Sequence, residues 1–215
     1  MNPTSRAARS VLVVMLVMVL AACGAAPLAG SNDQAPDAGG TRLLPAIMPV
    51  GEDPTAEHAD CVVVGMSFDD DVTIPAGASC AFTDVVIDGN VVLAHGASLV
   101  AVGGAVAGNV LVYPAASFDA DRTVVDGNVQ AERSVAVRLV MVRLDGDVQT
   151  DRTDVTTVEG GRVAGTVQVW DNGSVEVWDN RIEGDLQCEG NTPAPIGGGN
   201  RVDGGAEGQC SALGL

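Results

Sequence analysis

One short phrase recurs along this chain at a constant interval. It reads IDGNVVL at residues 87–93, VAGNVLV at 106–112 and VDGNVQA at 125–131. The glycine of the phrase recurs six times in succession with equal steps, at Gly89, Gly108, Gly127, Gly146, Gly165 and Gly184. A constant period of this length is typical of a solenoid, in which each repeat covers the apolar face of the next. The chain is therefore constrained to a stack of similar units.

The positions around each glycine predict short strands. Apolar residues stand two positions before and two positions after the glycine, and the residues between them are mostly polar. This alternation of period two indicates a strand with one buried face. A second apolar pair stands ten and twelve residues after the glycine, as at Leu99 and Ala101, with Thr156 in the weakest instance. Turn-like stretches such as AHGAS and WDNGS separate the pairs, so one unit holds two or three strands.

These features predict an all-β chain, folded as a single-stranded right-handed parallel β-helix of about eight 19-residue coils. Helical repeats are excluded because no period of 3.6 residues is present and the units are rich in β-branched residues. A left-handed hexapeptide β-helix would need an 18-residue coil and an apolar residue at every sixth position. Neither is found here. We expect the repeated glycine to let the coil bend or neighbouring backbone come close.

Four cysteines test the stacking. Cys61 and Cys80 are one repeat apart, while Cys188 and Cys210 are separated by one repeat plus a short insertion in NTPAPIGGGN. Strands stacked at about 4.8 Å would bring such pairs within the distance that a disulfide requires. We predict both disulfides, one at each end of the stack, where unpaired strand edges need protection. With two histidines in the whole chain, no metal site and no cofactor are expected.

The N-terminal residues predict the cellular address. Arg6 and Arg9 precede the apolar run Val11–Leu20, which is shorter than the roughly 20 residues of a membrane-spanning helix and suits a signal peptide. The stretch LAAC that ends at Cys23 resembles the lipobox of bacterial lipoproteins. The resemblance implies cleavage before Cys23 and acylation of that residue. The alternative is an ordinary secretory signal cut nearby, which leaves Cys23 as a free thiol.

Three segments follow from these observations: a lipoprotein signal peptide at 1–22, a lipidated cysteine with a flexible tether at 23–55, and a β-helix domain at 56–215. We expect an exported protein, lipid-anchored at the cell membrane or in the cell envelope. The net charge of −17 includes Arg6 and Arg9 and no lysine, so cleavage makes the mature chain more acidic still. Such acidity excludes nucleic acid as a partner and leaves cell-wall glycan, an envelope protein or self-association.

The repeated GNV coils over about residues 84–187 resemble bactofilins, which are bacterial polymer-forming β-helix proteins. Residues 184–210 resemble the closing segment of exported bacterial repeat proteins. The first resemblance implies a structural role based on stacked coils. Bactofilins are cytoplasmic and lack a lipobox and disulfides, and this chain departs from them on both counts, so polymerisation is not transferred to it.

Candidate binding residues come from the aromatic side chains. Trp170 and Trp178 stand in the twice-written phrase VWDN, and Tyr113 occupies the position of Trp170 three repeats earlier. If Val169 and Val177 face inward, both indoles face outward, where they can stack on sugar rings or contact a partner protein. The alternative is that they cover a turn. Four glutamines, at 130, 149, 168 and 187, predict a ladder of stacked amides, for which a structural role is favoured.

We expect a non-enzymatic, membrane-anchored cell-envelope lipoprotein that acts as a structural or binding scaffold, with no catalytic residue assigned. The alternative is a lyase or hydrolase that acts on a polysaccharide through outward carboxylates. Its candidate acids are Asp126, Asp145, Asp147, Glu183 and Asp185. Such an enzyme would have a groove across the coils in which these acids converge with Arg122, Arg138 or Arg143.

Overall fold

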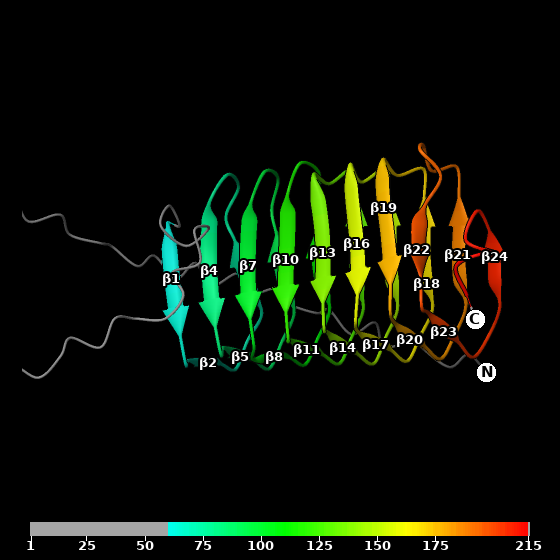
Figure 1. The fold of residues 1–215 in the computed structure, drawn as a ribbon. Coiled ribbons are helices and arrows are strands. Elements are labelled where there is room, and N and C mark those ends of the chain that lie inside the picture. The colour runs from blue at the N-terminus through cyan, green and yellow to red at the C-terminus, as the bar shows by residue number, and fades with distance from the viewer. Residues whose placement is uncertain (1–59, 215) are drawn as a thin grey trace, which may run out of the picture. The chain divides into compact units, whose positions relative to one another are not determined.

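The computed structural model describes residues 60–214, which form three eight-stranded parallel sheets. Each coil of the chain gives one strand to each sheet, so the predicted parallel β-helix of eight coils is confirmed (Figure 1). In Figure 1 the near strands run downward and the strands behind them run upward as the chain advances to the right, which is the sense of a right-handed coil. The predicted leader, Cys23, the tether and the start of the domain at residue 56 lie outside the described residues.

The first sheet contains the longest strands, which reach five residues. Its members are β1 (Cys61–Val64), β4 (Ser79–Thr83), β7 (Ser98–Val102), β10 (Ser117–Asp121), β13 (Ala136–Val140), β16 (Val155–Glu159), β19 (Ser174–Trp178) and β22 (Ile196–Gly198). Successive strands pair in register with a separation of one repeat, as Phe118 does with Val137. The last step is one residue longer, since Glu176 pairs with Ile196.

The second sheet is built from strands of two residues each. They are β2 (Ser67–Phe68), β5 (Val86–Ile87), β8 (Ala105–Val106), β11 (Val124–Val125), β14 (Arg143–Leu144), β17 (Arg162–Val163), β20 (Arg181–Ile182) and β23 (Arg201–Val202). The second residue of each strand faces the core, and the first faces outward. Because the outward residue is arginine in the last four strands, this sheet carries a column of like charge.

The third sheet closes each coil. It consists of β3 (Val72–Ile74), β6 (Val91–Leu93), β9 (Val110–Val112), β12 (Val129–Glu132), β15 (Val148–Asp151), β18 (Val167–Trp170), β21 (Leu186–Glu189) and β24 (Ala206–Gly208). From β12 to β21 the strands gain a fourth residue, which extends the outward face at the corner between the third and first sheets. Within residues 60–214 there is no helix of the length and apolarity that a membrane span requires.

One continuous apolar core runs through the stack. Its columns are the inward residues of the three sheets, among them Leu99, Phe118 and Val137 in the first sheet, each at most 2% exposed. Burial of such a side chain stabilises the fold by about 1.5–3 kcal/mol. The alternation predicted from the sequence therefore places the same residues inside that the structure does.

The repeated glycines lie at the corner between the second and third sheets, where successive coils leave no room for a Cβ atom. A Cβ atom on Gly127 would stand 2.5 Å from the carbonyl oxygen of Gly108 in the preceding coil. The amide of Gly127 donates to that same oxygen at 3.2 Å. Close backbone approach, one of the two reasons expected for this glycine, is thus confirmed.

A ladder of side-chain oxygens continues along the same corner. Oδ1 of Asn90 accepts the backbone N–H of Asn109 at 2.8 Å, and Oδ1 of Asn109 accepts that of Asn128 at 2.9 Å. The series passes to the carboxylate of Asp147, which accepts the N–H of Thr166 at 2.8 Å. Each polar residue after the glycine therefore satisfies a backbone donor of the next coil, which a turn alone would leave unpaired.

Both predicted disulfides are present. Cys61 and Cys80 are register partners on β1 and β4, with Cα atoms 4.6 Å apart. Cys188 and Cys210 have Cα atoms 5.3 Å apart, although Cys188 pairs in register with Gly208. Cys210 lies two residues further on, in the turn that folds back beneath the last coil. The extra spacing of this pair therefore comes from one inserted residue and from that turn.

Candidate binding groove

Two exposed aromatic side chains share one column at the corner between the third and first sheets. Trp170 ends β18 and pairs in register with Asp151, which pairs with Glu132. Tyr113 directly follows Val112, whose register partner Ala131 directly precedes Glu132, so Tyr113 begins the same column. Val169 is fully buried while Trp170 is 39% and Tyr113 is 51% exposed. The expected outward orientation of the Trp170 indole is therefore found.

A surface hollow of about 470 Å³ lies between these two rings. Tyr113 and Trp170 are at its ends, the amides of Gln130 and Gln149 line it, and Glu132 and Asp151 stand between the rings. A second hollow of about 480 Å³ lies on the other side of Trp170 and is lined by the residues Gln187, Glu189, Glu207 and Gln209, among others. Trp170 thus separates two hollows along the third sheet. We call them together the corner groove.

The carboxylates of the first hollow are paired with arginine. Glu132 contacts Arg133 at 3.2 Å and Arg152 at 3.1 Å, and Arg152 also pairs with Asp151. The hydrogen bond and charge of Asp151 raise the pKa of the Arg152 guanidinium above its ordinary value. Both acids of the first hollow therefore contact a guanidinium group.

The four glutamines form two pairs where a continuous ladder was predicted. Nε2 of Gln130 donates to Oε1 of Gln149 at 3.3 Å, and Nε2 of Gln168 donates to Oε1 of Gln187 at 3.1 Å. An amide side chain carries two N–H donors and an oxygen with two lone pairs. Each amide therefore keeps hydrogen-bonding capacity beyond its pair, and Gln130, Gln149 and Gln187 line the two hollows.

Trp178 lies away from this groove. It ends β19, at the corner between the first and second sheets, and pairs in register with Gly198 of the last coil. Its ring atom Cζ3 is 3.5 Å from the point where a Cβ of Gly198 would stand. Of the three candidate binding residues, the structure brings Tyr113 and Trp170 together, while Trp178 covers a glycine of the next coil.

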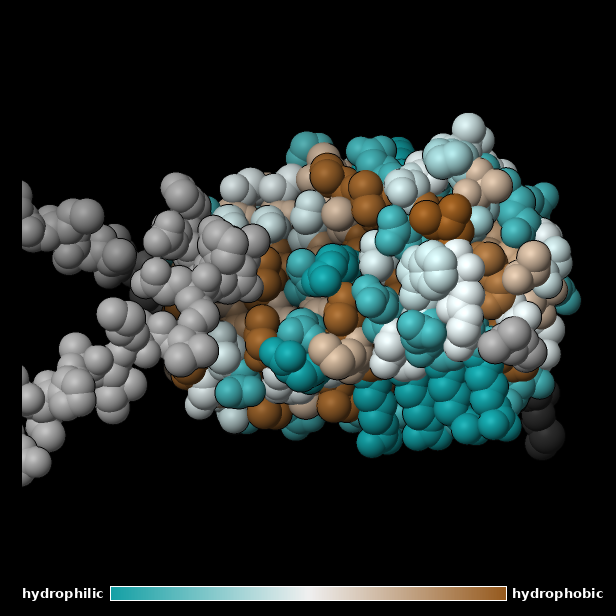
Figure 2. All heavy atoms as spheres, in the orientation of Figure 1, coloured by the Kyte–Doolittle hydropathy of each residue, from teal (hydrophilic) through white to brown (hydrophobic). Residues whose placement is uncertain are grey.

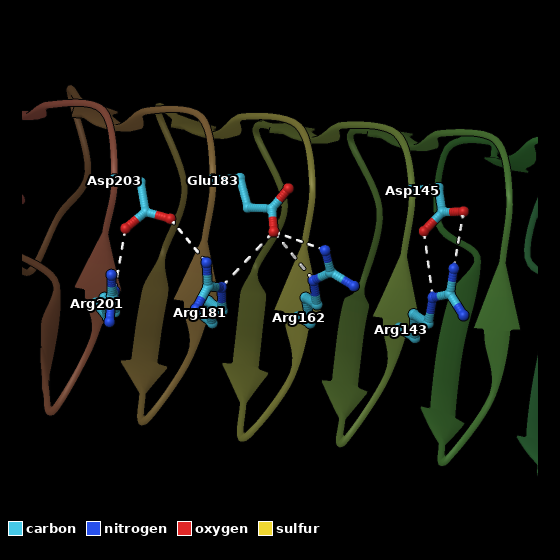
Figure 3. Close-up of polar contacts among 7 residues, drawn as sticks. All are labelled: Arg143, Asp145, Arg162, Arg181, Glu183, Arg201 and Asp203. Atoms are coloured by element: carbon cyan, nitrogen blue, oxygen red, sulfur yellow. Dashed lines mark hydrogen bonds and ion pairs between the residues drawn. The ribbon is translucent and has the colours of Figure 1, made fainter.

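The acids considered for catalysis are distributed over two different sites. Asp145 and Glu183 lie on the outward face of the second sheet with Asp203 and four stacked arginines (Figure 3). Hydrophilic residues gather along the lower edge in Figure 2, where β14, β17, β20 and β23 lie in Figure 1. Asp147 and Asp185 instead belong to the corner ladder, where they accept backbone N–H groups at 2.8 and 2.7 Å.

The three arginines that an enzyme would bring to its acids stand apart from one another. Arg122 pairs with Asp121 at 2.9 Å, Arg138 with Asp119 at 3.1 Å and Arg143 with Asp145 at 3.3 Å. Arg122 follows β10, Arg138 is on β13 in the first sheet, and Arg143 is on β14 in the second. Among residues 60–214 no three histidine, cysteine or acidic side chains are grouped as metal ligands.

The pairing of Arg162 with Glu183 in the second sheet leads to a prediction about the pKa of one carboxyl group. Arg162 donates to Glu183 at 2.7 Å and holds the pKa of Glu183 below its ordinary value of 4.5. Because the pKa is lowered, this pair stabilises the fold above the ordinary pKa and the contribution is lost as pH falls through the lowered one. We expect Arg162→Gln to raise the pKa of Glu183, as measured by an NMR titration of its side-chain carboxyl carbon. Arg143→Gln, which removes the partner of Asp145, should leave Glu183 unchanged.

The three sheets, their strand registers and the corner groove define a parallel β-helix protein with an aromatic-bordered groove at one of its corners. Comparisons of this chain with protein-family models, with curated proteins and with solved structures gave no match. The fold class therefore rests on the strand registers, and the groove on the contacts of its own side chains.

Proposed function

We propose that this chain is a non-enzymatic lipoprotein of the cell envelope, in which a rigid β-helix is held at a membrane as a structural and binding scaffold. The stretch LAAC ending at Cys23 supports the lipid anchor. Two disulfides fit an exported compartment, since thiols stay reduced in the cytosol. The resemblance of the GNV coils to bactofilins supports a structural use of the stack.

The observation that carries the binding role is the corner groove. Large apolar side chains at a rigid surface mark binding sites more often when they line a hollow with polar groups than when they stand alone. Tyr113 and Trp170 lie at the two ends of such a hollow, between which stand Glu132 and Asp151. The parallel β-helix holds Glu132, Asp151 and Trp170 at the ends of strands and Tyr113 directly after one, so the surface is ordered before a ligand arrives.

A scaffold is favoured over the alternative of a polysaccharide-acting enzyme by the pairing of the acids. Glycosidases use two carboxyl groups, one of which must hold or accept a proton. The two acids between the aromatic rings, Glu132 and Asp151, both contact arginine. Four of the five acids proposed from the sequence pair with arginine outside the groove or accept backbone N–H groups, as Asp145 and Asp147 do.

The anchor is tested with the full chain expressed in a bacterium that lipidates exported proteins. We expect the wild-type protein to incorporate labelled palmitate and to sediment with membranes. Cys23→Ser should carry no label and remain in the soluble fraction, because no acyl chain can form at that residue. An unchanged distribution of the Cys23→Ser variant would remove the lipoprotein assignment. Capture of envelope components by the lipidated protein, compared between wild type and Trp170→Ala, tests the binding role.

A further inference from the structure

We propose that the corner groove binds a neutral, linear hexose polymer with equatorial linkages, which lies parallel to the axis of the coil stack. This inference rests on the proposed binding function and names its ligand. It follows from three features of the described residues: the spacing of two aromatic rings, the polar groups between them, and the charge that surrounds them.

The spacing of the rings matches the ligand. Tyr113 and Trp170 occupy one column three coils apart, which at about 4.8 Å for each coil amounts to about 14 Å along the stack. A pyranose ring with its glycosidic oxygen, when the linkages are equatorial, has nearly the length of one coil spacing. A chain along the groove therefore advances about one sugar for each coil. Sugars three positions apart stack on Tyr113 and Trp170, and two lie between them.

The shape of the polymer matches the two rings. Equatorial linkages give a flat, extended chain whose rings present apolar C–H faces, and such faces stack on aromatic side chains. Axial linkages curve the chain, so it cannot reach both rings along a straight column. The second hollow beyond Trp170, of about 480 Å³, continues the same line and gives room for further sugars.

The polar groups between the rings match the hydroxyls of a sugar. Gln130 and Gln149 use one amide group each in their mutual bond and keep further donors and acceptors for a ligand. Glu132 and Asp151 stand on the two coils between the rings, and their arginine partners fix their positions. Carboxylates held in this way accept hydrogen bonds from hydroxyl groups with little loss of side-chain entropy.

The charge selects a neutral polymer. The arginines Arg133 and Arg152 are paired with acids in the first hollow, and the second hollow carries Glu189 and Glu207. The chain as a whole has a net charge of −17. A uronic-acid or phosphate-containing polymer would meet like charge in the second hollow and be repelled there.

The test uses the full lipidated chain in a detergent without a sugar head group, titrated with cellohexaose by calorimetry and by tryptophan fluorescence. We expect binding of cellohexaose, with no binding of maltohexaose, whose linkages are axial at C1, or of a β-1,4-linked hexaglucuronate, which keeps the equatorial linkages and is anionic. Tyr113→Ala and Trp170→Ala should each weaken the affinity about tenfold, because each removes one stacking surface. Trp170→Phe should retain most of it.

Trp178→Ala is the matched control, since Trp178 is 38% exposed against 39% for Trp170 but lies outside the groove. It should bind cellohexaose as the wild type does. Failure of cellohexaose to bind the folded wild type, or an equal loss in Trp178→Ala, would overturn the inference. If no hexose polymer binds while Trp170→Ala loses an envelope protein that the wild type captures, the binding scaffold stands and the glycan ligand is wrong. Circular dichroism of each variant confirms that it is folded.

Discussion

Gly127→Ala is expected to lower the free energy of unfolding by about 4 kcal/mol. The added methyl group would stand 2.5 Å from the carbonyl oxygen of Gly108, and only a local separation of the two coils could relieve that contact. Overpacking of this kind costs about 1–3 kcal/mol. Separation would also weaken the bonds from Gly127 to Gly108 and from Asn128 to Asn109, each worth roughly 1 kcal/mol.

Gly205→Ala is the control for this substitution. Gly205 lies at the same corner in the last coil, but a Cβ there would have no neighbour closer than 3.7 Å. Its N–H bond to Asp185 at 2.7 Å does not depend on the side chain. We expect Gly205→Ala to leave the urea midpoint unchanged or slightly higher, since alanine has less backbone entropy to lose. Equal loss in both variants would show that glycine at this corner is needed for some reason other than coil approach.

Much of the fold was predictable because its information is periodic. Each repeat carries the same inward columns, so Val110 and Val129 could be assigned to one face without any knowledge of their neighbours. The cysteine spacing then fixed two points of the stack. Units that repeat in the sequence stack on one another in space, so the register of every coil except the last followed from the period.

The corners were less predictable because their polar residues are ambiguous in sequence. From the sequence alone, Asn90 and Asn109 could be solvated polar residues. In the structure, the side-chain oxygen of each accepts a backbone N–H of the next coil. Thr156 looked like the weakest apolar position of its column, and it is fully buried in a polar cluster. The signal that was available is the recurrence of asparagine at the interval of the repeat, which a solvated turn does not require.

For the candidate site, period two was enough to direct the Trp170 indole outward. It could not show that Tyr113 and Trp170 border one hollow while Trp178 covers Gly198, because this depends on the length of the strand between two corners. The sequence also placed Asp145 and Asp147 on one face, although the chain turns the corner between them. One pairs with Arg143, and the other joins the corner ladder.

The second large effect is expected at a buried polar cluster inside the last coils. Asn172 is 2% exposed, and its Oδ1 accepts the N–H of Thr153 at 2.8 Å. Its Nδ2 donates to Thr150 Oγ1 at 2.7 Å and to Thr156 Oγ1 at 3.2 Å. Asn172→Val removes this partner from three buried groups, and the two hydroxyls keep only their mutual bond at 3.3 Å. Since each such loss costs about 1–3 kcal/mol, we expect the free energy of unfolding to fall by about 4 kcal/mol.

The triple variant Thr150→Val, Thr156→Val and Asn172→Val separates hydrogen bonding from packing. Valine already fills the paired positions, since Thr150 pairs with Val169 and Thr156 pairs with Val137 and Val175. With both hydroxyls removed, the N–H of Thr153 is the one group of the cluster left unpaired, so the total loss should shrink to about 2 kcal/mol. Adding two substitutions would thus recover stability, a non-additivity that urea unfolding of the three variants measures directly. A shared hydrogen-bond network predicts that removing the two hydroxyls after Asn172 raises the free energy of unfolding. A triple variant less stable than Asn172→Val would therefore mean that the cost of the substitution comes from poor packing of valine at this position.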